Sequence, residues 1–467
     1  MIASIGRSFG LLFVGQAVSR LLAFAVVIHL GRVLGPDGFG VLVFAMSVLG
    51  YAALVIEIGF DTLAPLEVAR GQIPVPDLVR AVVTLRLMML AVAFGALALF
   101  AWLAPVTPMT RVAITVYGAS LIANVFDLGW VFMGAREMAP ATMAEITTQA
   151  LQAAGAFLLV REPEHLLRMP WVFLVSRLIT VAGLVVAVRK RHGPFGLGLD
   201  RELVSRLLPA CLPLSGAASA AALVINFDTV LLGLWTGAFA VGVYGAANRV
   251  AWVPSLAAIA YFTSLRPVLA RGSVSGFPAI APVLRRSVRA AGALGFGIAG
   301  GGLVLADPLV ALFYGPHFAA AAAPLRLLLV SVAFLFVSRH YRALLQAFQH
   351  QVVDFKIMLA SATTNVVLNI WLIPRTGVVG AAAATVVSEG VILAATLLAA
   401  RRLIGDATDL RSLAGAVVSS AAMAGELELT GPLPLVGRLA LGAVVYLGLI
   451  LAFRVVSFED VREALGT

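Results

Sequence analysis

Five arginines lie inside long apolar runs of the chain, where a charged side chain is costly if the runs cross a membrane. They are Arg20, Arg177, Arg249, Arg339 and Arg342. Arginine stays protonated almost regardless of burial, and its planar guanidinium matches the oxygens of a phosphate group. Charged residues at membrane depth usually face a protein interior or a wet cavity. The arginines therefore predict a cavity that receives an anion.

Gln16 adds a neutral hydrogen-bonding group to this set. It precedes Arg20 by one helical turn, so the two side chains are expected on one face of the first apolar helix. The sequence thus predicts Gln16 as a substrate-binding residue together with the five arginines.

Carboxylates in or near the same runs offer a competing interpretation, because an arginine within a membrane can form an internal ion pair. The candidates for ion pairing or for binding a coupling ion are Asp61, Asp127, Asp228 and Glu389, with Glu57 as a further partner for Arg20. The sequence leaves open whether the arginines bind substrate or neutralise these acids.

The elements that position these residues follow from composition. The chain has 467 residues, of which 61% are hydrophobic and 12% charged, and its mean hydropathy is +1.02. A soluble domain carries about 25% charged residues, and a membrane helix needs roughly 20 apolar ones. We expect an all-α polytopic membrane protein with fourteen spans, near 8–30, 38–59, 81–103, 112–133, 145–160, 170–188, 208–232, 241–265, 288–313, 324–347, 356–373, 378–400, 411–425 and 436–456.

The net charge of +10 is explained by topology. With both termini in the cytoplasm, 21 of the 33 Lys and Arg residues, Arg86 among them, fall on the cytoplasmic side and seven fall outside. This bias follows the positive-inside rule, so the sequence predicts cytoplasmic termini and no nucleic-acid partner.

No pattern of catalytic or metal-binding residues is evident. Cys211 is the only cysteine, the six histidines are scattered, and there is no Walker loop. The outside loops are too short for an extracellular catalytic domain. We therefore expect no enzyme activity, no cofactor and no metal.

An internal repeat relates the two halves of the chain. The segment "LGRVLGPDGFG" (30–40) aligns with "LGLWTGAFAVG" (232–242), and "LVSR" (174–177) aligns with "VVSE" (386–389). Arg177 and Glu389 then occupy equivalent positions. The sequence predicts two parallel six-helix lobes and two added helices, with lobes at 1–190 and 208–403, a cytoplasmic linker at 191–207 and the extra helices at 404–467. Lobes of this kind can rock in alternating access.

Three segments resemble the polysaccharide flippases of the multidrug, oligosaccharidyl-lipid and polysaccharide exporter (MOP) superfamily, and O-antigen translocases in particular. They are "RVLGPDGFGVLVFAMSVLGYAALVIEIGFD" (32–61), "WVFMGAREMAP" (130–140) and "LLQAFQHQ" (344–351). The resemblance implies a flippase that turns a lipid-linked oligosaccharide from the cytoplasmic to the outer leaflet of a bacterial inner membrane.

The expected partners are a lipid-linked oligosaccharide and membrane lipids, with a polysaccharide polymerase or glycosyltransferases as candidate protein partners. Two alternatives stay open within the superfamily. One is a multidrug-type exporter, for which we expect a cavity lined by acids and aromatic residues. The other is a flippase for the peptidoglycan lipid precursor.

Overall fold

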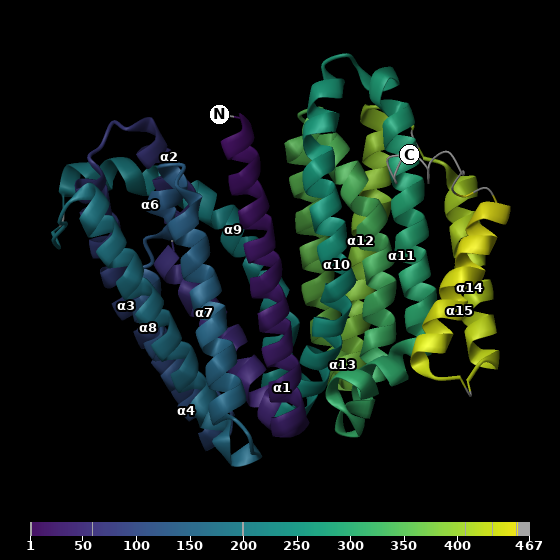
Figure 1. Cartoon of the computed structure of the whole chain (residues 1–467), viewed down its shortest axis with the longest axis horizontal. Helices are drawn as coiled ribbons and strands as arrows, with labels where there is room; N and C mark the ends of the chain where they lie inside the picture. The colour runs from purple at the N-terminus through teal and green to yellow at the C-terminus, as the bar shows by residue number, and fades with distance from the viewer. Residues whose placement is uncertain are drawn as a thin grey trace. The chain divides into compact units, whose positions relative to one another are not determined.

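The chain is described by a computed structural model (Figure 1). It covers the backbone of residues 2–57, 59–198, 200–406, 408–431, 433–453 and 455, without the side chains of 2–17, 210, 212–225, 256, 257, 259, 260, 263 and 264. No strand occurs in these residues. The α-helices are α1 (Ile2–Glu57), α2 (Phe60–Arg70), α3 (Val75–Leu103), α4 (Pro108–Ala119), α5 (Leu121–Val125), α6 (Gly129–Gly134), α7 (Met138–Leu159), α8 (Arg168–His192), α9 (Arg201–Trp235), α10 (Ala238–Ser273), α11 (Phe277–Tyr314), α12 (Ala322–Ala347), α13 (Gln351–Leu403), α14 (Leu410–Leu429) and α15 (Leu435–Ala452), with short 3₁₀ turns at Pro163–Leu167 and Pro316–Ala321.

The predicted all-α membrane fold is confirmed. Eight segments of the described residues are long and apolar enough to cross a membrane. Two of these, within α1 and α13, contain kinks at Gly35 and Gly377, where the backbone φ angles are 66° and 57°. When α1 and α13 are divided at these glycines and α4 to α6 are taken as one column, fourteen membrane-length segments result.

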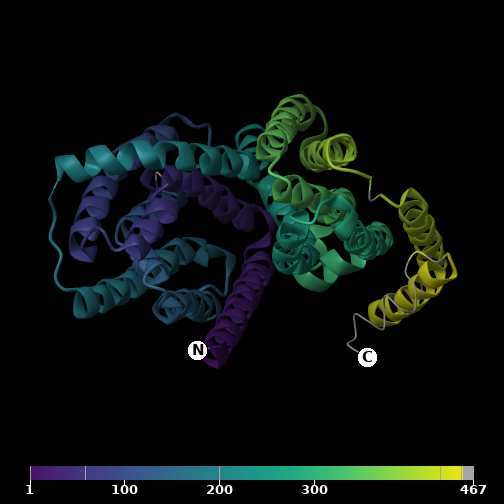
Figure 2. The same ribbon diagram turned by 90° about the horizontal axis from the view of Figure 1, so that it is seen from above.

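The chain divides into two compact units, Met1–Gly242 and Val243–Thr467. The division falls within α10, whereas the predicted linker 191–207 lies inside the N-terminal unit. In that unit α1 packs against α3, α4, α7 and α9, and α7 packs against α8. Residues 193–198 connect α8 to α9 without regular structure (Figure 2).

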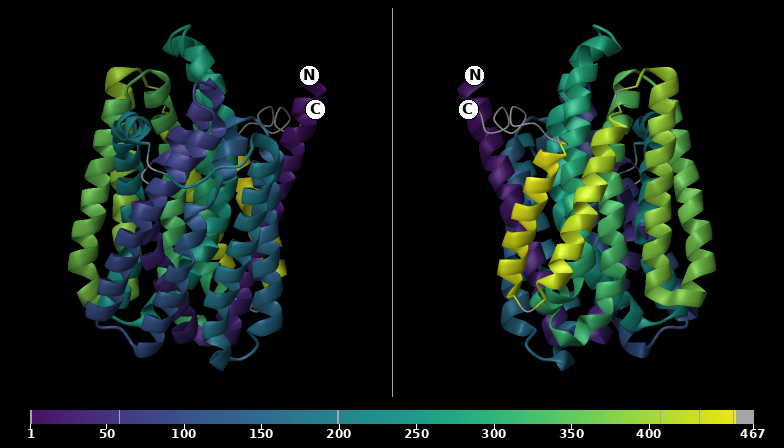
Figure 3. Two further views of the ribbon diagram at one scale, coloured as in Figure 1. Left: turned by 90° about the vertical axis from the view of Figure 1, so that its left-hand side faces the viewer. Right: turned by 90° about the vertical axis from the view of Figure 1, so that its right-hand side faces the viewer.

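In the C-terminal unit α12 packs between α11 and α13. The last two helices, α14 and α15, form a hairpin (Figure 3), and α14 packs against α11. Asp409 begins α14 by accepting a hydrogen bond from the Ser412 backbone N–H at 3.1 Å, which satisfies one of the free donors at the helix start.

Two local structures recur in both six-helix repeats. Gly35 and Gly237, 202 residues apart, both have a positive φ, of 66° and 91°, where each turns the chain between two spans. Arg136 and Gln349 both have φ of 61°. The residue after each donates its backbone N–H across the turn over 2.8 Å, from Glu137 to the Phe132 carbonyl and from His350 to the Leu345 carbonyl. The two pairs of turns thus share backbone geometry at positions that the predicted repeat aligns.

Gly40 and Gly242 are required for a close backbone approach within the N-terminal unit. A Cβ atom on Gly40 would lie 1.8 Å from the Ala238 carbonyl oxygen, and one on Gly242 would lie 1.9 Å from that of Pro36. Only glycine fits at either position. The repeat thus places its glycines where the two turns touch.

Candidate functional site

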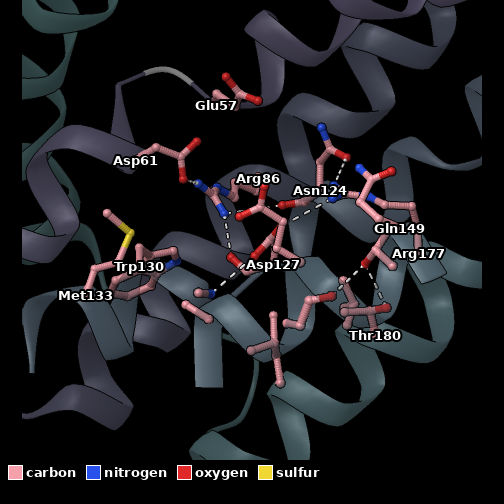
Figure 4. A pocket seen from close by; sticks show the side chains of 17 residues that line it. Glu57, Asp61, Arg86, Asn124, Asp127, Trp130, Met133, Gln149, Arg177 and Thr180 are labelled. Carbon is pink, nitrogen blue, oxygen red and sulfur yellow. Dashed lines mark hydrogen bonds and ion pairs between the residues drawn. The ribbon is translucent and has the colours of Figure 1, made fainter. Parts of the chain in front are cut away.

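A polar cavity of about 540 Å³ lies inside the N-terminal unit (Figure 4). This volume is within the usual range for small-molecule sites, about 300–1,000 Å³. The cavity lies among α3, α5, α6, α7 and α8, with the end of α1 and the start of α2. Its lining residues are Glu57, Asp61, Arg86, Asn124, Asp127, Gly129, Trp130, Met133, Ala141, Ala144, Glu145, Thr148, Gln149, Arg177, Thr180, Val181 and Leu184.

Arg86 of α3 supports one wall of this cavity. Its side chain is 1% exposed, and its Nη2 donates to the Asp61 Oδ1 over 2.7 Å. Its Nη1 lies 3.2 Å from the backbone carbonyl oxygens of both Asn124 and Asp127. These two carbonyls belong to the interruption between α4 and α6, where the helical hydrogen-bond pattern breaks. Arg86 therefore holds together α3, the start of α2 and this irregular segment.

Arg177 of α8 approaches the same irregular segment from the opposite side. It donates to the Asn124 side-chain oxygen over 2.9 Å and lies 3.6 Å from the Asp127 carboxylate. The Asp127 carboxylate also accepts the Gly129 backbone N–H at 3.2 Å, at the first residue of α6. Arg177 thus has an acidic partner within its own unit.

Hydroxyl and amide groups of α7 and α8 complete the cavity. The Thr148 hydroxyl donates to the Thr180 hydroxyl over 2.9 Å, which ties the two helices together. Glu145 and Gln149 lie on the cavity side of α7. Four carboxylates line the cavity against two guanidinium groups. The cavity is therefore polar and acidic, in contrast to the arginine-rich cavity expected from sequence.

In the C-terminal unit Arg342 is held by an acid that sequence reasoning did not consider. Its Nε and Nη2 donate to the two oxygens of Asp354 over 2.8 and 3.2 Å. Gln346 donates to the same carboxylate over 2.8 Å. This bidentate pair joins α12 to α13 beside the turn at 347–350, so in the described residues it has a structural contact.

Arg339 lies one turn before Arg342 in α12 and interacts electrostatically with Glu389 of α13. Arg177 and Glu389 are equivalent in the predicted repeat. Arg177 lies near the Asp127 carboxylate, and Glu389 interacts with Arg339 of α12. The charge order is therefore reversed between the repeats, with acid and arginine exchanged.

The remaining predicted residues lie apart from the cavity lining. Arg20 and Arg249 have exposed side chains, and neither forms an ion pair among the described residues. The Gln16 side chain lies outside the described residues. Asp228 is 8% exposed and accepts the Thr229 backbone N–H at 2.7 Å. Of the eleven residues named from the sequence, four line the cavity: Glu57, Asp61, Asp127 and Arg177.

Sequence reasoning assigned Arg86 to the cytoplasmic charges and so missed it. Arg86 lies six residues inside the run at 81–103, a position that could have marked it as a charge within a span. Glu145, Gln149 and Thr148 were also missed. They recur at positions three and four residues apart, as expected for one polar face of an otherwise apolar helix.

Comparisons with known proteins agree with the fold and with the resemblance seen in the sequence. The family model described as "Polysaccharide biosynthesis protein" matches residues 5–273, more than half of the chain. The protein named "Putative O-antigen transporter" from Escherichia coli (strain K12) is 25% identical over 252 residues, which are 53% of this chain and 60% of that protein. "Probable flippase AglR" from Haloferax volcanii is 32% identical over 179 residues, 37% of each protein. The matches cover less than two thirds of either relative.

A solved structure of the lipid II flippase MurJ in an inward closed conformation has a TM-score of 0.78 to this chain. It covers 94% of this chain and 97% of its own, at 12% sequence identity, so the likeness concerns the fold alone. The family match, in contrast, rests on sequence over most of the N-terminal unit. This chain belongs to the polysaccharide biosynthesis protein family of multi-pass membrane proteins.

Proposed function

We propose that the chain is a flippase for a lipid-linked oligosaccharide. It moves a sugar on a polyprenyl phosphate or diphosphate from the cytoplasmic to the outer leaflet by alternating access, for the biosynthesis of surface polysaccharide or O-antigen lipopolysaccharide. One observation carries this proposal: apolar helices enclose a polar cavity of about 540 Å³. A polar headgroup needs such an environment to cross hydrocarbon, because exposed polar groups there lose their hydrogen bonds to water.

We assign the phosphate contacts to Arg20 and Arg249. Both side chains are exposed and stand apart from the ion pairs of the described residues. Arg177 and Arg342 are occupied by Asp127 and Asp354, which makes them structural candidates first. Gln16, one turn before Arg20, stays a predicted hydrogen-bonding partner of the substrate.

A multidrug-type exporter is the second candidate, and the acidic character of the cavity favours it. Four carboxylates and the Trp130 indole are groups that attract a lipophilic cation. A flippase for the peptidoglycan lipid precursor is a third, since it would carry the same phosphate and sugar chemistry. Transport of tetraphenylphosphonium separates the second candidate from the other two.

The proposed site of action is the bacterial inner membrane, with both termini in the cytoplasm and no catalytic step performed by the chain. A polymerase or glycosyltransferases are the proposed protein partners. Pro163 and Leu197 lie beyond opposite ends of α8, so single cysteines there report orientation. In a chain lacking Cys211, a membrane-impermeant maleimide added outside intact cells should label Pro163→Cys and spare Leu197→Cys. Labelling of Leu197→Cys alone would reverse the proposed orientation.

Deletion of the gene tests the function directly. We expect the deletion strain to accumulate lipid-linked oligosaccharide on the cytoplasmic leaflet and to lose surface polysaccharide, and the wild-type gene to restore both. Unchanged polysaccharide, combined with greater sensitivity to lipophilic cations, would favour the exporter.

A further inference from the structure

The cavity of the N-terminal unit is poorly suited to a phosphate group. Both of its arginines already contact acceptors: Arg86 contacts Asp61 at 2.7 Å and two backbone carbonyls, and Arg177 contacts Asn124 at 2.9 Å. A phosphate would also meet four carboxylates. Like charges at short range in a low-dielectric interior repel strongly. Asp61 and Asp127 are paired with the two arginines, so Glu57 and Glu145 form an acid excess that disfavours a dianion in this cavity.

Two buried donors of the lining nevertheless lack an acceptor among the described residues. They are the Trp130 Nε1, in a residue that is 3% exposed, and the Arg86 Nε, in a side chain that is 1% exposed. Figure 4 shows Trp130 beside Arg86 and Asp127 at the cavity. A buried unpaired donor costs about 1–3 kcal/mol. A ligand that brings neutral oxygen acceptors would remove this cost.

The opposite wall offers acceptors to a ligand that brings hydroxyl donors. Glu145 and Gln149 are one turn apart on α7 and both line the cavity, as does Glu57 at the end of α1. Ionised carboxylates only accept hydrogen bonds, whereas an amide both donates and accepts. Among the described residues no group of three or more His, Cys, Asp or Glu is arranged to hold a metal ion. The lining therefore matches a polyhydroxylated neutral molecule better than a metal or an anion.

We propose that this cavity is the saccharide subsite of the flippase. It binds hydroxyl groups and neutral oxygen atoms of the glycan, while the phosphate is held elsewhere. This inference rests on the proposed function. It assigns Gln149 and Glu145 to sugar hydroxyls and the Trp130 indole N–H to a sugar oxygen. The acid excess then serves to accept hydrogen bonds from hydroxyls and to exclude the phosphate from the cavity.

Cysteine protection in the full-length protein tests this assignment. In nanodiscs and with Cys211 replaced by serine, Ala144→Cys places a thiol in the cavity lining, whereas Leu197→Cys places one in the exposed connection between α8 and α9. The probe is the phosphate-free glycan released by mild acid from the lipid-linked oligosaccharide of the expressing cells. We expect it to slow maleimide labelling of Ala144→Cys at least tenfold and to leave labelling of Leu197→Cys unchanged. Inorganic pyrophosphate should protect neither.

A second variant tests the contact itself. Gln149→Leu should raise the glycan concentration needed for half-protection about tenfold, since it removes hydrogen bonds at similar volume. Gln152→Leu changes the same residue type on the same helix, outside the lining, and should leave that concentration unchanged.

Protection by pyrophosphate, or no protection by the glycan at saturation, would overturn the saccharide subsite. The proposed function is judged separately, by flipping of lipid-linked oligosaccharide in vesicles. Flipping without protection by the glycan would contradict the saccharide subsite and would still support the flippase function. Protection by tetraphenylphosphonium, without any flipping, would contradict both the saccharide subsite and the flippase function.

Discussion

The two units treat equivalent charges differently. In the N-terminal unit Arg177 and Asp127 lie 3.6 Å apart and open onto a cavity of about 540 Å³. In the C-terminal unit the corresponding charges are exchanged: the arginine, Arg339, is on α12, and the acid, Glu389, is on α13. Both of these charged residues are half-buried, whereas His340, which follows Arg339 in the sequence, is fully buried and hydrogen-bonds Ser287 over 2.7 Å.

This contrast indicates that the charged side chains have diverged between the repeats while the turns keep their backbone geometry. The turns at Arg136 and Gln349 have the same φ of 61° and the same hydrogen bonds, although the sequences around them differ. Reversal of the charge order preserves attraction between the helices in each repeat and changes which helix presents which charge.

Removal of Arg86 is expected to have the largest effect. Arg86→Ala leaves two backbone carbonyls in the irregular segment without their donor and should cost about 3 kcal/mol of unfolding free energy. Asp61→Asn should cost about 1 kcal/mol or less, because the Asp61 side chain is 53% exposed and can be rehydrated. Thermal unfolding in detergent measures both. Equal losses would show that the ion pair, and not the carbonyl contacts, organises this wall.

Arg20 separates transport from stability. Arg20→Ala should lower flipping at least tenfold at normal protein abundance, since a charged hydrogen bond contributes about 1.5–3 kcal/mol. Arg20→Lys keeps the charge and loses the planar fork, so it should retain more activity. Flipping in vesicles and protein level are measured together. Reduced abundance that a second substitution of an acid restores would indicate an ion pair in place of a substrate contact.

The α14–α15 hairpin has no counterpart in the N-terminal unit, and its helix cap can be tested alone. Asp409→Ala should destabilise α14 by about 1 kcal/mol, whereas Asp409→Asn should retain most of the cap. Slight burial raises the pKa of Asp409, but hydrogen bonds from Ser412 and nearby arginines outweigh it and hold the pKa below its usual value. The ionised cap therefore stabilises the fold at neutral pH, and this contribution is lost as pH falls through the lowered pKa.

Thermal unfolding of wild type and Asp409→Asn between neutral and acidic pH checks that linkage. The advantage of the aspartate should shrink as pH falls. An advantage that grows toward acid would contradict the sign of the shift.

The smallest effect is expected for the half-exposed ion pair Arg177–Asp127 in the cavity. A double-mutant cycle of Arg177→Gln and Asp127→Asn should give a coupling energy of about 0.5–1 kcal/mol, because the side chains are 26% and 40% exposed. A coupling of several kcal/mol would mean that this pair, like Arg86, is a structural centre of the unit.

Much of the fold follows from the sequence, because a membrane leaves few options for an apolar chain. Spans of about twenty apolar residues and the glycines at 35 and 237 mark the helices and their turns. The sequence does not predict in the same way which residues each charged side chain contacts. Arg86 contacts residues that are 25 to 41 positions away in the sequence. Two of them lie where the helix is interrupted between α4 and α6, and neither Asn124 nor its direct neighbours are proline or glycine, the residues that usually mark such an interruption.

Transport in proteoliposomes tests the central claim most directly, that the chain moves a lipid-linked glycan and not a lipophilic cation. Purified protein is reconstituted with lipid-linked oligosaccharide, and the glycan exposed on each leaflet is measured beside efflux of tetraphenylphosphonium from the same vesicles. We expect the glycan to redistribute between leaflets, Arg20→Ala to lower this redistribution at least tenfold, and cation efflux to stay at the level of empty vesicles. Cation efflux without redistribution of the glycan would contradict it.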